Sequence, residues 1–240
     1  MIRVIASFLV VAIFALNLQA ADKRKIKPEE LVECPVSENL RGHENTEWSI
    51  AYSFNLTDEN KKDLPRVLLV GDSICNGYQG GVCRILDGKM NVSYWISSYC
   101  VTSPGYLRLL AFYLDEAKYD VIHFNNGLHS LSTPIADYMK GIKAAFQLIR
   151  LKQPQAKLIW AASTPLKEAD KTAKAKELNE ASLNVITKIG QISINDLFKP
   201  MDALDRNEYW TDVFHFKKAA REIQAKQVSK ACLSALNLGN

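Results

Sequence analysis

The feature that most constrains the fold is a regular alternation of short apolar runs with helical patterns, which begins at residue 66. Residues 67–70 read Val-Leu-Leu-Val without a polar break, a pattern typical of a strand buried on both faces of a sheet. Four further runs predict strands at residues 91–96, 121–124, 158–162 and 192–197. Because alternating strands and helices build parallel sheets, we expect an α/β domain with a mainly parallel sheet of roughly five strands.

The segments between these runs have the periodicity of amphipathic helices. Within residues 135–149, apolar side chains recur at three- and four-residue steps and so share one helix face. Helices are also expected at 106–117, 177–189 and 217–236, and the lysine-rich residues 167–176 are interpreted as a solvated loop and helix face. The predicted buried stripe of the last helix consists of Ala220, Ile223, Val228 and Cys232.

The chain divides into three predicted parts. Residues 1–20 carry one positive charge at Arg3, an apolar run from residue 4 to 16 and small residues at the end, which is the order of a secretory signal peptide. An uncleaved anchor is the alternative. Residues 21–64 are polar and irregular and are interpreted as an N-terminal arm, and residues 65–240 as the single domain. We therefore expect an exported protein, either periplasmic or secreted, with no stable membrane span after signal cleavage.

Composition excludes some functions and leaves the cysteines open. A net charge of +4 gives no electrostatic case for nucleic-acid binding, so no nucleic-acid partner is expected. Export would permit disulfides, but pairing cannot be deduced from sequence, and free buried thiols with at most one bridge are the favoured interpretation. No spacing makes a zinc pattern. The five cysteines are Cys34, Cys75, Cys83, Cys100 and Cys232.

A serine follows the first predicted strand, in the sequence Gly71-Asp72-Ser73-Ile74. In parallel sheets, sites form at the carboxyl ends of strands, so Ser73 is placed where a nucleophile would be exposed beside the N–H groups of a helix N-terminus. The alternative is an ordinary helix N-cap, for which Asp and Ser are both favoured.

A second candidate element precedes the last predicted helix. Asp212 and His215 are three residues apart, so one turn can present both, with the histidine facing a serine and the aspartate holding its other ring nitrogen. The alternative is a surface aspartate beside a partly buried histidine. Tyr209 and Trp210, just before Asp212, either form an aromatic wall over the site or pack in the interior.

Taken together, these two elements resemble the SGNH/GDSL hydrolases. Gly-Asp-Ser at the end of the first strand and Asp-x-x-His before the last helix match that family, and the resemblance covers roughly residues 66–236. It implies a flavodoxin-like three-layer sandwich. It also implies that Ser73 is the nucleophile, His215 the base and Asp212 the residue that orients the base, with no metal or cofactor.

The family completes its oxyanion hole with a glycine and an asparagine. Gly105, at the start of a predicted helix, matches the glycine by position, although a turn glycine is the alternative. In place of the usual Gly-x-Asn-Asp the chain has Gly127-Leu128-His129-Ser130, so His129 stands where the asparagine belongs. A histidine N–H can also donate to an oxyanion, so we predict an oxyanion hole of Ser73, Gly105 and His129, with Asn126 as second choice.

The resemblance implies an esterase that forms an acyl-serine intermediate. Exported family members often deacetylate carbohydrates, so we expect the substrate to be an acylated small molecule or glycan from which an acetyl group is removed. We expect the protein to be a monomer. Lipid or lysophospholipid esters are the second choice. A non-catalytic binding module that kept the fold is an alternative from another class, and so is a structural envelope protein.

Overall fold

The computed structural model describes residues 48–53 and 63–238. The predicted signal peptide, residues 21–47 and 54–62 of the predicted arm, and Cys34 lie outside the described residues. Within the described part, no helix is long and apolar enough to cross a membrane.

A six-stranded sheet forms the centre of the molecule, with the strand order β1-β3-β2-β4-β5-β6. Strands β2 to β6 are all parallel, and β1 pairs antiparallel to β3. The parallel part has the flavodoxin-like order, in which the first strand lies between the second and the third. The strands are β1 Ser49–Tyr52, β2 Arg66–Gly71, β3 Asn91–Ser97, β4 Val121–Phe124, β5 Lys157–Ala161 and β6 Ile192–Asn195.

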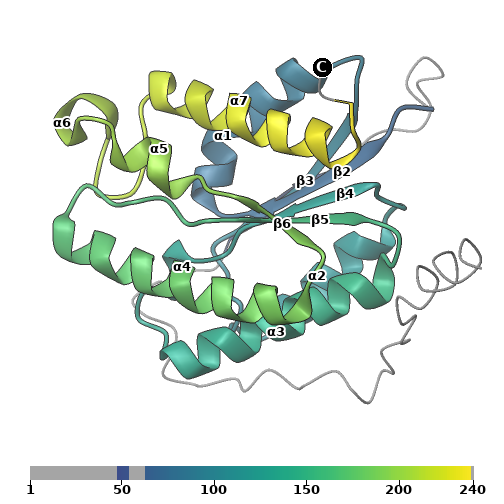
Figure 1. Cartoon of the computed structure of the whole chain (residues 1–240), viewed down its shortest axis with the longest axis horizontal. Coiled ribbons are helices and arrows are strands. Elements are labelled where there is room, and N and C mark those ends of the chain that lie inside the picture. Colours follow the sequence, from purple (N-terminus) through teal and green to yellow (C-terminus); the bar gives the residue numbers. More distant parts are fainter. Residues whose placement is uncertain (1–47, 54–62, 239–240) are drawn as a thin grey trace, which may run out of the picture.

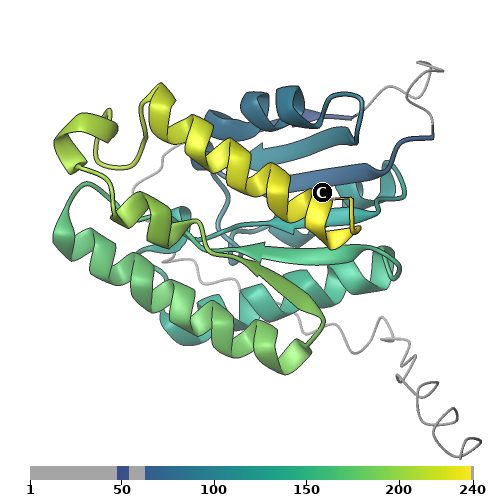
Figure 2. The same cartoon turned by 45° about the horizontal axis from the view of Figure 1, so that its top comes forward.

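Helices cover both faces of the sheet, so the predicted three-layer α/β architecture is confirmed. Figures 1 and 2 show α1 and α7 on one face and α2, α3 and α4 on the other. The long helices are α1 Ser73–Leu86, α2 Tyr106–Asp115, α3 Ile135–Lys152, α4 Ala169–Ile189 and α7 Lys218–Ala235. Three shorter helices are η3 Leu128–Ser130, α5 Phe198–Asp202 and α6 Arg206–Tyr209.

The molecule has one hydrophobic core on each face of the sheet, and the apolar run of β2 contributes to both. Successive side chains of a strand point to opposite faces, so Val67 and Leu69 pack with α1 and α7, whereas Leu68 and Val70 pack with α2, α3 and α4. All four are at most 1% exposed. A central parallel strand therefore needs an uninterrupted apolar sequence, as predicted from residues 67–70.

Two elements differ from the sequence-based expectation. Residues 49–52, which lie in the predicted irregular arm, form β1 and add a strand to the expected five. The strand is exposed throughout and lacks an apolar pattern; it is held by its partners, including the Trp95 indole N–H that donates to Ser49 Oγ at 2.8 Å. Helix α4 begins at Ala169 and not at residue 177, because ion pairs such as Lys171–Glu168 and Lys174–Glu177 support a polar first half.

The predicted buried stripe of the last helix is wrong at one position. Ala220, Val228 and Cys232 are fully buried in α7, but Ile223 is 36% exposed. Its neighbour Gln224 is buried instead, with only 1% exposed. Residues 220, 224 and 228 are four apart and share one helix face, so the geometry of the helix overrides the hydrophobicity of Ile223.

The cysteines of the described part are all free thiols, namely Cys75, Cys83, Cys100 and Cys232. Burial raises the pKa of the Cys232 thiol to about 12, so it stays protonated and behaves as an apolar core residue. Free thiols, most of them buried, are thus what the structure shows for these four.

Candidate active site

The structure places Ser73 at the carboxyl end of the central strand β2. Asp72 alone separates Gly71, the last residue of β2, from Ser73, the first residue of α1. The helix is capped by Asp72, whose Oδ1 accepts a hydrogen bond from the N–H of Ile74 at 2.9 Å. Because Asp72 takes the capping role, the hydroxyl of the half-buried Ser73 is available for another partner.

That partner is His215, which connects the first and last segments of the domain. The His215 Nε2 atom lies 2.8 Å from Ser73 Oγ, although the two residues are 142 positions apart in the chain. On its other side, His215 Nδ1 lies 2.9 Å from Asp212 Oδ2 and 3.1 Å from Asp212 Oδ1. The structure therefore brings the predicted serine, histidine and aspartate into one hydrogen-bonded chain.

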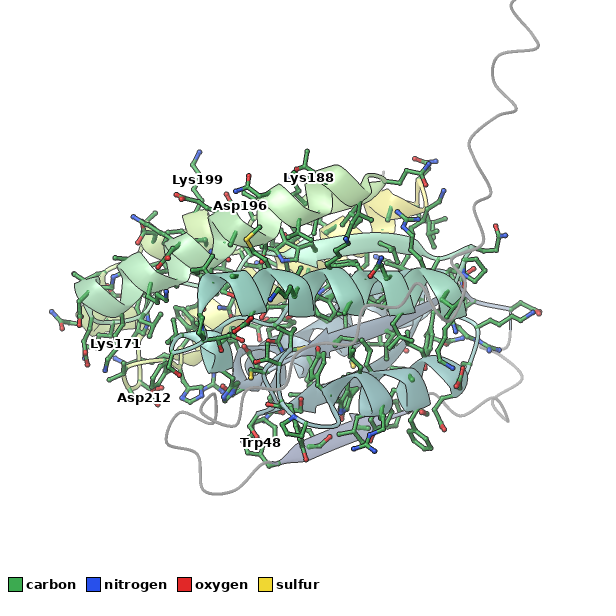
Figure 3. All side chains as sticks on the ribbon, turned by 90° about the horizontal axis from the view of Figure 1, so that it is seen from below. Trp48, Lys171, Lys188, Asp196, Lys199 and Asp212 are labelled. Atoms are coloured by element: carbon green, nitrogen blue, oxygen red, sulfur yellow. The ribbon has the colours of Figure 1, made fainter. Side chains whose placement is uncertain are left out.

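The surroundings of Asp212 favour its ionised form. Burial acts to raise the pKa of the carboxyl, but the backbone N–H groups of His215 and Phe214 and the His215 ring outweigh it and lower the pKa to about 2. Figure 3 shows Asp212 at the same end of the molecule as Lys171. An ionised Asp212 accepts from the Nδ1–H of His215, which leaves Nε2 as the acceptor for the Ser73 hydroxyl.

Gly105 is the residue immediately before α2, and its backbone requires glycine. Its φ of 84° lies in the left-handed region that side chains disfavour. The loop that contains it follows β3, which lies directly beside β2 in the sheet. Among the described residues, no hydrogen bond from its N–H is found.

Asn126 is used to hold two loops together. Its Oδ1 accepts from the N–H of Val101 at 3.2 Å and from the Ser130 hydroxyl at 3.3 Å, and its Nδ2 donates to the Tyr99 carbonyl at 2.8 Å. These contacts join the loop after β3 to the loop after β4. A positioning role therefore suits Asn126 better than a role as oxyanion donor.

His129 lies in η3, the short helix that follows β4, and is half-buried. The loop is pressed against the end of β5, because a Cβ at Gly127 would lie 1.8 Å from Ser163 Oγ. Strands β3 and β4 flank β2, so the loops that carry Gly105 and His129 follow the two strands on either side of the one that ends at Ser73.

Trp210 does not form an aromatic wall. It is 1% exposed and packs on Phe216, with ring centroids 4.4 Å apart, while the guanidinium of Arg206 stacks on it at 4.5 Å. The isolated bridge between Trp210 and Phe216 closes the turn that contains Asp212 and His215. The tryptophan therefore supports this turn from the interior.

A cavity that no sequence pattern predicted lies beside Ser73. We call it the α1–α7 slot; it has a volume of about 190 Å³ and is lined by Ser73, Ile74, Asn76, Gly77, His215, Phe216, Arg221 and Gln224. Its polar residues come mainly from the first turns of two helices and carry no motif. The one available signal was the three-residue step from residue 221 to 224, which places both on one helix face. Separately, within the described part, no group of three or more His, Cys, Asp or Glu side chains is placed to hold a metal ion.

Comparisons by sequence find no relatives. No protein-family model matches the chain, and no curated protein matches it. Solved structures do match. A GDSL-like lipase from Bacteroides thetaiotaomicron is 17% identical, with a TM-score of 0.60 over 72% of this chain and 90% of its own. An acetyl esterase, solved as a mutant with an acetate ion, is 13% identical, with a TM-score of 0.58 over 72% of this chain and 99% of its own.

A third similar structure contains a carbohydrate. It is a family two carbohydrate esterase from Clostridium thermocellum in complex with cellohexaose, 14% identical, with a TM-score of 0.55 over 72% of this chain and 65% of its own. At these identities the likeness is one of fold. The chain thus has the α/β fold of the SGNH/GDSL hydrolases and carbohydrate esterases, as the motifs around Ser73 and His215 implied.

Proposed function

We propose that the protein is a serine esterase that hydrolyses carboxylic esters through an acyl-serine intermediate. The observation that carries this proposal is the hydrogen-bonded chain from Ser73 Oγ through His215 to Asp212. A nucleophile, a base and a group that orients the base are the parts that acyl transfer by serine needs. Asp212 and His215 stand on one turn, and Ser73 on the tight connection between β2 and α1.

The reaction has two halves. Ser73 Oγ attacks the ester carbonyl carbon while His215 Nε2 takes the hydroxyl proton. The bond to the alcohol oxygen then breaks, and His215 returns the proton to that oxygen, leaving an acyl-serine. In the second half, water attacks the acyl carbon and gives a proton to His215, which passes it to Ser73 Oγ as the carboxylic acid leaves. Asp212 stabilises the imidazolium form of His215 in both halves.

The negative oxygen of each tetrahedral intermediate needs hydrogen-bond donors. We assign this role to the N–H groups of Ser73 and Gly105 and to the ring N–H of His129. The N–H of Ser73 lies at the N-terminus of α1, where anions are favoured. Such donors contribute about 3 kcal/mol each to the stability of the transition state.

Removal of a short acyl group, in particular acetyl, from a carbohydrate is the substrate assignment we favour. Support comes from the similar structures, which include an acetyl esterase with acetate and a carbohydrate esterase with cellohexaose. We further propose, from residues 1–20, that the protein is exported and acts in the periplasm or outside the cell.

Hydrolysis of aryl esters with short and long acyl chains tests this function, with Ser73→Ala as the matched variant. The proposal expects turnover of the acetate ester by the wild type and its loss in Ser73→Ala, together with covalent labelling of Ser73 by a fluorophosphonate probe. A preference for long chains would replace the carbohydrate assignment with lipid esters. No turnover of any ester and no labelling would contradict the esterase function.

A further inference from the structure

The α1–α7 slot opens directly beside the Ser73–His215 pair. Its depth is limited, because α1 and α7 approach closely one turn further along. A Cβ at Gly81 would lie 2.6 Å from the Cβ of Ala225. Gly77 lines the slot, and a Cβ there would lie 3.4 Å from Arg221 Cδ, an ordinary contact distance. The slot therefore adjoins Ser73 and His215 and narrows toward Gly81 and Ala225.

Gln224 is unusual because it is a buried amide without partners. It is 1% exposed, and neither its Oε1 nor its Nε2 has a hydrogen-bond partner among the described residues. It stands on the buried face of α7, where an apolar side chain would pack without loss of hydrogen bonds. An unpaired buried amide destabilises a fold, and such local conflicts are expected where a residue serves a function.

Arg221 presents a second polar group at the slot. Its Nε donates to the carbonyl oxygen of Phe216, which fixes the guanidinium beside the turn that carries His215. No carboxylate pairs with it among the described residues, since the neighbouring Glu222 is bound to Arg84. Its remaining N–H groups can therefore donate to a ligand.

We propose that the α1–α7 slot binds one sugar ring of the alcohol part of the ester, and that Gln224 is the residue that selects it. This inference rests on the proposed esterase function and adds its specificity site. Both amide atoms are closed to water in this structure, so the side chain has to turn toward the slot, where two neighbouring hydroxyl groups would satisfy Nε2 and Oε1 together. A volume of about 190 Å³ holds roughly six water molecules at about 30 Å³ each, which suits one ring and excludes a long acyl chain.

The position of His215 indicates which half of the ester enters the slot. The leaving alcohol oxygen must receive its proton from His215 Nε2, so the alcohol lies on the His215 side of Ser73. His215 lines the slot. The acyl group then lies toward the loops that carry Gly105 and His129, away from α7.

The experiment compares two acetate esters, an acetylated methyl glycoside and 4-nitrophenyl acetate, in wild type and Gln224→Leu. Both share the acyl group, but only the glycoside has a hydroxyl-bearing ring. We expect the ratio of kcat/KM for glycoside over aryl acetate to fall at least roughly tenfold in Gln224→Leu, mainly through KM. Gln79→Leu is the matched control, because Gln79 lies on α1 outside the slot, and it should leave the ratio unchanged.

Two further measurements separate the possible failures. Gly77→Leu fills the slot from α1 and should lower the same ratio. It replaces Gln224→Leu as the test if that variant does not fold. Binding of the unacetylated methyl glycoside to Ser73→Ala, followed by protein NMR, tests the slot without turnover. Ester hydrolysis with an unchanged ratio in both variants would overturn the slot assignment and leave the esterase intact. Glycoside binding that depends on Gln224, without hydrolysis by the wild type, would support the slot and overturn the esterase.

Discussion

At the residue scale, Asp212 has two roles: it accepts hydrogen bonds that shape its turn, and it acts on the ring of His215 through its negative charge. Its Oδ1 accepts from the backbone N–H groups of Phe214 and His215 at 2.8 and 2.9 Å, which shapes the turn. Its negative charge acts on the ring of His215. An asparagine can keep the first task with its carbonyl oxygen but loses the charge, so the two tasks can be tested separately.

We therefore expect Asp212→Asn to lower kcat by roughly 10²–10⁴-fold while the protein stays folded. The neutral amide would no longer stabilise the imidazolium that forms during acyl transfer. Steady-state kinetics on an aryl acetate, beside a urea unfolding curve, checks both halves of the prediction. A large fall in the free energy of unfolding, together with the fall in kcat, would show instead that the turn had lost its structure.

His129 and Asn126 differ in what they are expected to do. Asn126 is committed to Tyr99, Val101 and Ser130, whereas His129 is the proposed oxyanion donor. We expect His129→Ala to lower kcat by roughly 100- to 1,000-fold with little change in KM, because the donor acts only on the transition state. Asn126→Ala should instead lower mainly the free energy of unfolding, because it removes the contacts to Tyr99, Val101 and Ser130. Equal kinetics of His129→Ala and wild type would remove His129 from the oxyanion hole.

At the scale of elements, adjacent glycines of α1 have opposite surroundings. A Cβ at Gly80 would meet nothing within 4 Å, whereas one at Gly81 would lie 2.6 Å from Ala225 Cβ on α7. We expect Gly80→Ala to raise the free energy of unfolding by about 0.5–1 kcal/mol, and Gly81→Ala to lower it by about 1–3 kcal/mol. Urea unfolding of both variants measures this difference. A stabilised Gly81→Ala would mean that the two helices can move apart freely.

Sequence patterns predict those helices and strands whose burial requires an apolar pattern. The apolar run of β2 follows from packing on both faces of the sheet and the stripe of α3 from packing on one face, and both were predictable from sequence. The strand β1 was not predictable, because its exposed residues owe their conformation to a partner strand distant in sequence. Gln224 was also missed, since hydrophobicity favoured Ile223 for the buried face. Asp212 and His215 were predictable as a pair because they are three residues apart, and Ser73 because it follows the buried run of β2. The slot was not predictable, because it forms between two helices that are distant in the chain.

At the scale of the whole molecule, chain topology brings the site together. Ser73 and His215 stand near opposite ends of the described chain, and they meet because α7 packs beside α1 on the same face of the sheet (Figure 1). Parallel strands all present their carboxyl ends at one edge, so the loops after β2, β3 and β4 gather there. The fold therefore places each candidate side chain near a rigid strand or helix end.

The same central sheet contains a titratable group that links stability to pH. His123 in β4 is fully buried, and its ring Nε2 accepts from the Nδ2 amide of Asn195 at 3.0 Å. Burial lowers the pKa of His123 to about 4, so the ring is neutral in the folded protein at pH 7. The unfolded chain binds a proton at this side chain below a pH of about 6.5.

Because the unfolded state then holds more protons, stability is full above pH 7 and falls as pH drops from about 6.5 to about 4. The shift corresponds to about 3 kcal/mol from this side chain. His123→Gln keeps an acceptor for Asn195 but does not titrate. We expect the difference in free energy of unfolding between wild type and His123→Gln, measured in urea at pH 8, 6 and 4, to shift against the wild type by that amount. Parallel pH curves for the two proteins would show that His123 is protonated equally in both states.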